Sequence, residues 1–198
     1  MRDFLLDTQT VAYWYDTKRP EHATVVGNLV RLNGLAVGLV HKPRLLVSVV
    51  TLGEIEYGCR SQVGQAPALA QERRRFLDQQ LPECLEVSRD AVDSYGELRA
   101  RLFEKYAPQV LRSRVRRPEQ LIDPATSLSL GIQENDLWLC AQAMGHGLVL
   151  VTNDRMNRIR DAASSTSPPL LLQNWTRSDS ASISSEDGAP SPAVAPLS

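Results

Sequence analysis

The sequence predicts an α/β fold whose central sheet is mainly parallel and is flanked by helices. Short apolar segments alternate with longer segments of helical periodicity in the order β-α-α-β-α-α-β-α-α-β-α-β, which is typical of strands joined by crossover helices. Residues 148–151 form an unbroken apolar run, as expected for a strand buried on both faces. A helical segment leads directly into this run, so the two form half of a parallel crossover unit.

Five apolar segments are predicted as strands, at residues 2–6, 45–50, 84–87, 148–151 and 170–175. Helical periodicity is found at residues 8–15, 20–32, 51–58, 67–80, 88–106 and 134–144. Thr51 is a predicted N-cap with Glu54 at the capping-box spacing, and Ser88 is the predicted N-cap of the helix that ends near Tyr106. Residues 107–131 have weak periodicity, and we expect an extended basic loop with room for a helical turn.

The composition is that of a soluble globular protein, with 198 residues, 42% hydrophobic and 23% charged. A formal net charge of −1 gives no overall attraction to nucleic acid, so such binding would need local basic patches. The three cysteines and three histidines lack metal-ligand spacing, which argues against a disulfide framework and a zinc site. We identify no signal peptide and no run of about 20 apolar residues, so we expect a cytoplasmic protein without a membrane segment.

The composition changes after residue 175. Residues 176–198 are rich in Ser, Ala and Pro and contain few large apolar side chains. Such a segment cannot bury enough surface to offset the entropy lost on ordering. We therefore predict one domain over residues 1–175, followed by a disordered tail.

Four carboxylates follow predicted strands or begin the helices after them. Asp7 and Asp154 come directly after apolar runs, whereas Glu54 and Asp136 lie in first helical turns. If the strands are parallel neighbours, all four meet at the carboxyl edge of the sheet, where ligands bind in open parallel sheets. Clustered carboxylates repel one another unless a cation neutralises them. Because oxygen ligands suit hard divalent cations, we expect a Mg²⁺ or Mn²⁺ site.

Each of these acids also has a purely structural interpretation. Asp7 alone is typical of a strand-end turn, Glu54 of a capping box, and Asp136 of a first-turn partner of the helix dipole. Glu56 competes with Glu54, but the two lie about 200° apart around a helix, so both cannot face one site. Asn135 is the expected cap of its helix, which leaves Asp136 free for a metal ion.

Local clusters of arginine are the candidate basic patches. The run Arg73 to Arg75 is interpreted as a solvated helix face. A denser patch lies in the 107–131 loop, and it consists of Arg112, Arg114, Arg116 and Arg117. This second patch is a candidate site for the phosphates of RNA.

Four segments resemble the PIN-domain nucleases, and most closely the VapC-like toxins of type II toxin–antitoxin pairs. They are residues 4–8 (FLLDT), 47–58 (VSVVTLGEIEYG), 134–143 (ENDLWLCAQA) and 150–154 (LVTND). The resemblance implies a PIN-like three-layer fold over residues 1–175. It also implies a catalytic metal site formed by Asp7, Glu54, Asp136 and Asp154, with Thr152 assisting. The long 107–131 loop and the tail after residue 175 depart from the family.

The leading functional prediction is a Mg²⁺- or Mn²⁺-dependent endoribonuclease that acts as a toxin. A small antitoxin protein that blocks the active site and self-association into a homodimer are implied by the resemblance. One alternative is a general RNA-processing nuclease or DNA flap nuclease without an antitoxin. Another is a non-catalytic PIN-like module whose acidic pocket only binds a partner.

Overall fold

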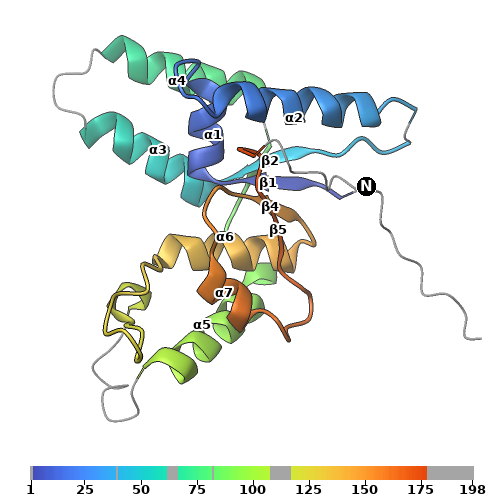
Figure 1. Cartoon of the computed structure of the whole chain (residues 1–198). Helices are drawn as coiled ribbons and strands as arrows, with labels where there is room; N and C mark the ends of the chain where they lie inside the picture. Colours follow the sequence, from blue (N-terminus) through green and yellow to red (C-terminus); the bar gives the residue numbers. More distant parts are fainter. Residues whose placement is uncertain (1, 39, 62–66, 82, 108–116, 178–198) are drawn as a thin grey trace, which may run out of the picture.

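A computed structural model describes residues 2–38, 40–61, 67–81, 83–107 and 117–177 of the chain (Figure 1). The strands and α-helices follow one another in the predicted order. Their bounds are β1 (Phe4–Leu6), α1 (Thr8–Tyr15), α2 (His22–Leu35), β2 (Leu45–Ser48), α3 (Val49–Ser61), α4 (Pro67–Gln80), β3 (Cys84–Leu85), α5 (Val92–Tyr106), α6 (Glu134–Gly145), β4 (Val149–Val151), α7 (Asn157–Ala162) and β5 (Leu171–Gln173). The 3₁₀ segments among the described residues are η1 (Arg89–Ala91) and η3 (Pro118–Gln120).

The five strands pair in parallel, in the order β3-β2-β1-β4-β5, which confirms the predicted sheet type. β1 is central, and Leu5 lies opposite Leu46 of β2 on one side and Leu150 of β4 on the other. The chain runs from β1 to β3 in one direction and then crosses back to β4 and β5. The order of strands therefore reverses beside β1, where parallel sheets form a ligand-binding crevice at the carboxyl ends of their strands.

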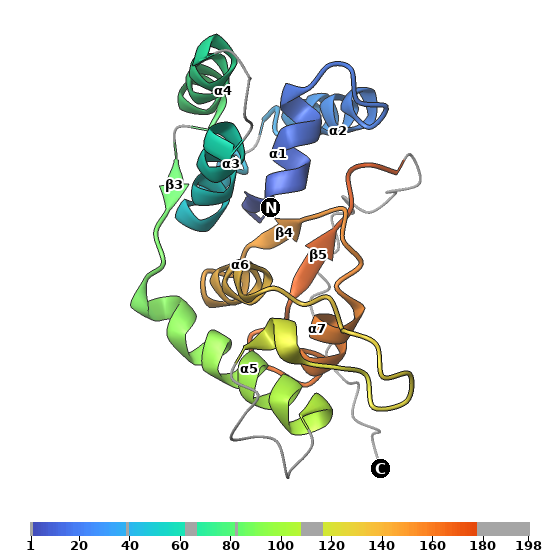
Figure 2. The ribbon, with the colours of Figure 1, turned by 90° about the vertical axis from the view of Figure 1, so that its left-hand side faces the viewer.

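Helices cover both faces of the sheet, with α1 to α4 on one face and α5 to α7 on the other (Figure 1 and Figure 2). Side chains alternate along β1, so the core has two halves. Phe4 and Leu6 pack with Val11, Val25 and Leu77 of the first helical layer. Leu5 packs in the other half, with residues of α5, α6 and α7. The predicted three-layer arrangement is confirmed.

The junction of the second strand and its helix differs from the prediction. β2 ends at Ser48 and α3 begins at Val49, two residues before the predicted N-cap. Thr51 is buried inside α3, and its hydroxyl donates to the Leu6 carbonyl at 3.5 Å. The prediction that Thr51 caps the helix is therefore wrong. Ser48 has a capping contact instead, because its hydroxyl accepts from the Val50 amide at 3.0 Å.

Ser88 caps a different element from the one predicted. Its side chain accepts from the Asp90 amide at the start of η1, and α5 begins only at Val92. The helical packing that follows is close. A Cβ atom added at Gly145 of α6 would lie 2.3 Å from the Asp90 carbonyl oxygen, so only glycine fits where α6 crosses η1.

Part of the predicted 107–131 loop is packed rather than extended. Leu121 is fully buried, and Ile122 forms an isolated antiparallel bridge with Ser129. The predicted helical turn is present as η3, while residues 108–116 lie outside the described part of the chain. Glu119 of η3 accepts a hydrogen bond from the Glu134 amide at 2.9 Å. The loop is thereby fixed to the first residue of α6.

Trp175 belongs to the core of the domain. The residue is 1% exposed, and its ring lies 5.4 Å from the ring of Phe4, centroid to centroid. Of the predicted disordered tail, residues 178–198 lie outside the described residues. Among the helices that the structure describes, none is long and apolar enough to cross a lipid bilayer.

Candidate active site

Asp7 lies at the carboxyl end of β1 and is the N-cap of α1. Its carboxylate accepts a hydrogen bond from the Thr10 amide at 2.6 Å, and its own amide donates to the Val151 carbonyl at 3.1 Å. The residue is only 6% exposed. An aspartate in this position satisfies an otherwise unpaired amide of the first turn. The cap therefore fixes a buried carboxylate beside the ends of β1 and β4.

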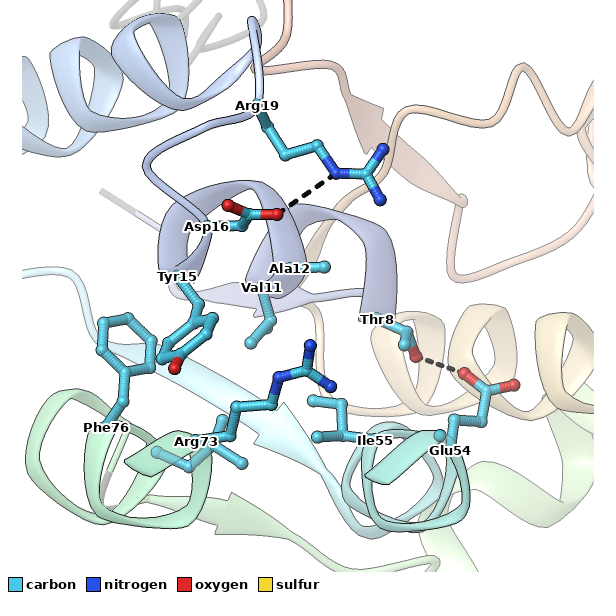
Figure 3. Close-up of a pocket in the computed structure, with 12 residues that line it drawn as sticks. Thr8, Val11, Ala12, Tyr15, Asp16, Arg19, Glu54, Ile55, Arg73 and Phe76 are labelled. Atoms are coloured by element: carbon cyan, nitrogen blue, oxygen red, sulfur yellow. Dashed lines mark hydrogen bonds and ion pairs between the residues drawn. The ribbon is translucent and has the colours of Figure 1, made fainter. Parts of the chain in front are cut away.

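Glu54 extends from α3 toward α1 and α6. The Thr8 hydroxyl donates to one of its carboxylate oxygens (Figure 3), and Asn135 Nδ2 donates to the other at 2.7 Å. Both oxygens thus accept from neutral side chains. The bonds join α3 to the first turns of the helices that carry Asp7 and Asp136.

Glu56 lies on a different side of α3. It forms ion pairs with Arg74 and Arg60, both at 2.6 Å. Hydrogen bonds from these guanidinium groups, Arg74 first, lower the pKa of Glu56 to about 2. The prediction that Glu54 and Glu56 cannot face the same site is confirmed.

Asp136 lies in the first turn of α6, whose N-cap is Gln133. The Gln133 amide donates to the Asp136 carboxylate at 2.9 Å, so Asp136 completes a capping box. The prediction that Asn135 caps this helix is therefore wrong. The Asn135 side chain turns to Glu54 instead, because Gln133 already occupies the capping position.

Thr152 and Asp154 follow β4 directly. Thr152 is 2% exposed, and its hydroxyl accepts from the Asp154 amide at 3.0 Å. The Thr152 side chain also interacts with the Asp7 carboxylate and lowers its pKa. Asp154 is exposed and accepts from the Met156 amide at 3.2 Å. Thr152 therefore links the acids that follow two neighbouring strands.

The four carboxylates are close enough to interact electrostatically. Burial raises the pKa of Asp136 to about 6, and the charges of the other three acids raise it as well. Burial also raises the pKa of Asp7, and the charge of Glu54 adds to this effect against hydrogen bonds from two threonines. Within the described ranges, none of the four forms an ion pair with Lys or Arg. In the described part of the chain, no paired Lys or Arg side chain offsets their mutual repulsion.

Carboxylate and hydroxyl oxygens dominate this edge of the sheet, and they are the ligands that Mg²⁺ and Mn²⁺ prefer. The chemistry of the donors therefore suits the implied cation. Among the residues that the structure describes, no three His, Cys, Asp or Glu side chains are grouped so that they could hold a metal ion. Each carboxylate instead accepts a hydrogen bond from a protein donor. A cation would have to draw these side chains closer together.

Sequence reasoning missed the neutral donors that hold the acids. Thr8 and Asn135 both donate to Glu54, and each is the chain neighbour of another predicted site residue. The sequence signal for these donors was a polar side chain next to an acid in two separate motifs, Thr8 after Asp7 and Asn135 before Asp136. Gln133 was also detectable, since Asp136 follows it at the capping-box spacing.

Two cavities adjoin the acids. The first has a volume of about 240 Å³, lies between α1, α3 and α4, and includes Thr8 and Glu54 in its wall (Figure 3). The second has a volume of about 250 Å³ and includes Asp136 and Asp154. The acidic edge is thus open to ligands through both cavities.

Most of the predicted RNA-binding patch falls outside the described residues, namely Arg112, Arg114 and Arg116. Arg117 is described, and it is the N-cap residue of η3. Its backbone amide donates to Gln120 Oε1 at 3.0 Å, and the residue is exposed. Arg117 is thus two residues before Glu119, which accepts the hydrogen bond from the first residue of α6.

Fold and site together define an α/β protein with a carboxylate-lined site at the carboxyl edge of a parallel sheet. Residues 4–163 match the PIN domain, a span that includes all four acids. The chain therefore belongs to the PIN-domain family, the nuclease family that its motifs resemble. A comparison with curated protein sequences finds no match.

Solved structures with a similar fold include three VapBC structures. VapBC2 from Rickettsia felis, bound to a DNA fragment from their promoter, has a TM-score of 0.59 and 23% identity, over 88% of this chain and 99% of that chain. DNA-bound VapBC from Salmonella typhimurium has a TM-score of 0.54 and 22% identity, over 88% and 99%. VapBC-1 from nontypeable Haemophilus influenzae has a TM-score of 0.53 and 20% identity, over 89% and 100%. At these identities the likeness establishes the fold.

Proposed function

We propose that this chain is a Mg²⁺- or Mn²⁺-dependent endoribonuclease that acts as the toxin of a toxin–antitoxin pair. One observation carries the proposal: four interacting carboxylates share the carboxyl edge of a PIN domain, and no Lys or Arg among the described residues pairs with them. Such a cluster destabilises the folded chain. A function that uses the negative charge, such as binding a cation for catalysis, explains why the fold contains this cluster of carboxylates.

Asp136 is the proposed general base. In the absence of a cation, burial and the charges of the neighbouring acids raise the pKa of Asp136 to about 6, so its carboxylate accepts a proton more readily than an exposed aspartate does. Glu54 is less suited to this step, since both of its oxygens already accept hydrogen bonds. Asp7, Asp154 and Thr152 would hold the cation with these two acids. When bound, such a cation would neutralise charge on the scissile phosphate and lower the pKa of the attacking water.

The toxin assignment is supported by the sequence motifs and by the likeness of the fold to VapBC structures. We infer that a small antitoxin protein covers the acidic edge and blocks it. We also infer that the PIN domain forms a homodimer. Both inferences come from the family resemblance. Copurification would test the antitoxin partner, and light scattering would test the homodimer.

RNA binding requires positively charged side chains near the site, because the acidic edge repels phosphate. Arg112, Arg114, Arg116 and Arg117 are the proposed phosphate contacts. The hydrogen bond from the Glu134 amide to Glu119 supports this role, since it fixes the end of the loop beside the first turn of α6. Arg117 therefore lies in a segment attached to the helix that carries Asp136.

The decisive experiment incubates the purified protein with a single-stranded RNA and with a DNA of the same sequence. We expect the RNA to be cut in the presence of Mn²⁺ and to stay intact in chelator. Asp136→Asn should abolish cleavage and relieve growth arrest in an expressing host while the protein still folds. Cleavage of DNA alone would favour the alternative nuclease, and Mn²⁺ binding without cleavage would favour the non-catalytic module.

A further inference from the structure

The first cavity opens beside the acids, and apart from Thr8 and Glu54 its lining residues have no part in the proposed chemistry. α1 forms one wall, and α3 and α4 form the others (Figure 3). Its volume of about 240 Å³ is below the roughly 300–1,000 Å³ of sites for drug-sized ligands. The space therefore suits one flat ring system rather than a large ligand.

Aromatic and aliphatic side chains supply much of the lining. The rings of Tyr15 and Phe76 meet edge to face, with centroids 5.3 Å apart. Val11, Ile55 and Leu77 also line the cavity. Surfaces of this kind stack against nucleobases, each of which has an apolar face.

Two acidic and two basic side chains also line the cavity. Arg19 and Asp16 form an ion pair at 3.5 Å, and Glu54 and Arg73 complete the set. The formal charges of these four residues cancel, so the cavity suits an uncharged ring better than a phosphate. Arg73 supplies N–H donors, which recognise carbonyl acceptors on the edge of a base.

Arg73 differs from its two neighbours in the sequence. Arg74 and Arg75 are exposed, as expected for a solvated helix face, but Arg73 is half-buried, so that interpretation is wrong for Arg73. Its guanidinium lies 5.7 Å from the centre of the Tyr15 ring and 3.8 Å from Cys59 Sγ. It extends from α4 across the cavity toward α1 (Figure 3).

We propose that this cavity binds one base of the RNA strand, next to the scissile phosphate. The base would stack in the space lined by Tyr15 and Phe76 and present its edge to Arg73. Glu54 and Thr8 belong both to the cavity wall and to the acidic edge, so a base held here leaves its phosphate beside the acids. The inference rests on the proposed function and adds to it a subsite that selects where the strand is cut.

Gly58 offers a way to close the cavity without removing any contact. It lies within α3 and lines the cavity, and a Cβ atom built there meets nothing within 4 Å. Gly96 lies within α5, is exposed and is equally free of neighbours. Both are interior helix positions, so Gly58→Leu and Gly96→Leu should each favour the helical state. Gly96→Leu is therefore a matched control on the opposite face of the sheet.

The test measures binding of short single-stranded RNAs in the Asp136→Asn background, with an abasic ribose placed at each position in turn. With Gly96→Leu, one abasic position should weaken binding by about tenfold, as expected for the loss of one stacked base. With Gly58→Leu, the intact RNA should already bind about tenfold more weakly, and that position should no longer matter. Gly58→Ala, which adds only a methyl group, should behave like Gly96→Leu.

A second variant tests whether Arg73 recognises the edge of the base. Arg73→Met keeps an unbranched apolar stem and removes the donors, so it should reduce the preference among bases at the sensitive position. The cavity assignment is overturned if Gly58→Leu binds every RNA as tightly as Gly96→Leu, or if both lose affinity at the same abasic position. Failure of the unmodified protein to cut RNA would overturn the proposed function without changing these binding measurements. Absence of all RNA binding would overturn both.

Discussion

Carboxylates at the two ends of the central strands differ in the charge of their hydrogen-bond donors. Just before β1, Asp3 accepts from the Arg44 guanidinium at 2.7 Å, and Glu83 accepts from the same guanidinium at 2.9 Å. At the carboxyl edge, Asp7 and Asp136 are buried or half-buried and interact with further acids, yet their hydrogen-bond donors are neutral. Among the described residues, an arginine pairs with the acids at the amino end of the sheet, and no Lys or Arg forms an ion pair with the four acids at the carboxyl end.

This difference separates acids that serve the fold from acids that are available for chemistry. A carboxylate paired with arginine keeps a low pKa and has little affinity for another cation. A buried carboxylate held only by neutral donors has a raised pKa and gains stability from any cation that reaches it. Within α3 the partners differ in the same way: Glu56 is paired with two arginines, whereas Glu54 accepts hydrogen bonds from Thr8 and Asn135 and has no arginine partner among the described residues.

The largest expected effect concerns these two glutamates. Glu54→Gln keeps an oxygen that accepts from Thr8 or Asn135 but removes a charge that would hold the cation, so RNA cleavage should fall by at least about a hundredfold. Glu56→Gln loses two exposed ion pairs, so it should leave the cleavage rate within about threefold of the unmodified protein and lower stability only slightly. Single-turnover cleavage assays measure both. Equal losses in the two variants would contradict the separation of roles within α3.

The next effect is a pH dependence in the absence of metal. The pKa of Asp136 is about 6 in the folded protein, against an ordinary value of 3.8. A raised carboxyl pKa contributes stability that is fully present below pH 3.8 and is lost as the pH rises through about 6. The contribution lost is at most about 3 kcal/mol. Thermal melts in chelator should therefore show a steeper decline from pH 4 to pH 7 for the unmodified protein than for Asp136→Asn; parallel curves would refute this assignment.

A smaller effect compares one acid from each end of the sheet. Asp7→Asn keeps a side chain that can cap α1 and removes a buried charge, so the metal-free Tm should rise by a few degrees. Asp3→Asn breaks an exposed ion pair, so the Tm should fall by a similar or smaller amount. Asp7→Ala separates the effect of the buried charge from that of the cap. It removes both, and the lost cap lowers the stability by about 1 kcal/mol relative to Asp7→Asn. Shifts of the same sign for Asp7→Asn and Asp3→Asn would remove the contrast between the ends.

The smallest effect concerns phosphate binding beside the acidic edge. Arg117→Ser should reduce the slope of log affinity against log salt by about 0.7 if its guanidinium contacts one phosphate of a single strand. Replacing all four loop arginines should reduce the slope by about 1 to 3 and leave sequence preference unchanged. Binding titrations at several salt concentrations, in the Asp136→Asn background, measure both. An unchanged slope would assign the loop to another partner.

The sheet and its acids were predictable because they follow from short-range patterns. An unbroken apolar run such as residues 148–151 indicates a strand covered on both faces, and a polar residue directly after it marks the carboxyl edge. Parallel pairing then brings Asp7 beside the end of β4, although the two are far apart in the chain. The separation of Glu54 from Glu56 follows from helical geometry alone.

Helix capping and the cavity were harder to predict, because they depend on local choices and on tertiary packing. Thr51 and Asn135 are good capping residues by type, but Ser48, three residues before Thr51, makes the capping contact of α3, and Gln133, two residues before Asn135, is the N-cap of α6. The first cavity combines side chains from three helices, so no segment of the sequence contains its pattern. Arg73 could not be distinguished from Arg74 and Arg75 until α4 was placed against α1.

The central claim is that the carboxyl edge of the sheet, and not the amino edge, is the cation site. Thermal melts with chelator and with a series of Mn²⁺ concentrations test it most directly, because an ion that binds the folded state raises the Tm by mass action. We predict that Mn²⁺ raises the Tm of the unmodified protein and of Asp3→Asn equally, and raises that of Asp136→Asn far less. If Mn²⁺ stabilises none of the three, or stabilises Asp136→Asn as much as the unmodified protein, the four acids do not form one cation site.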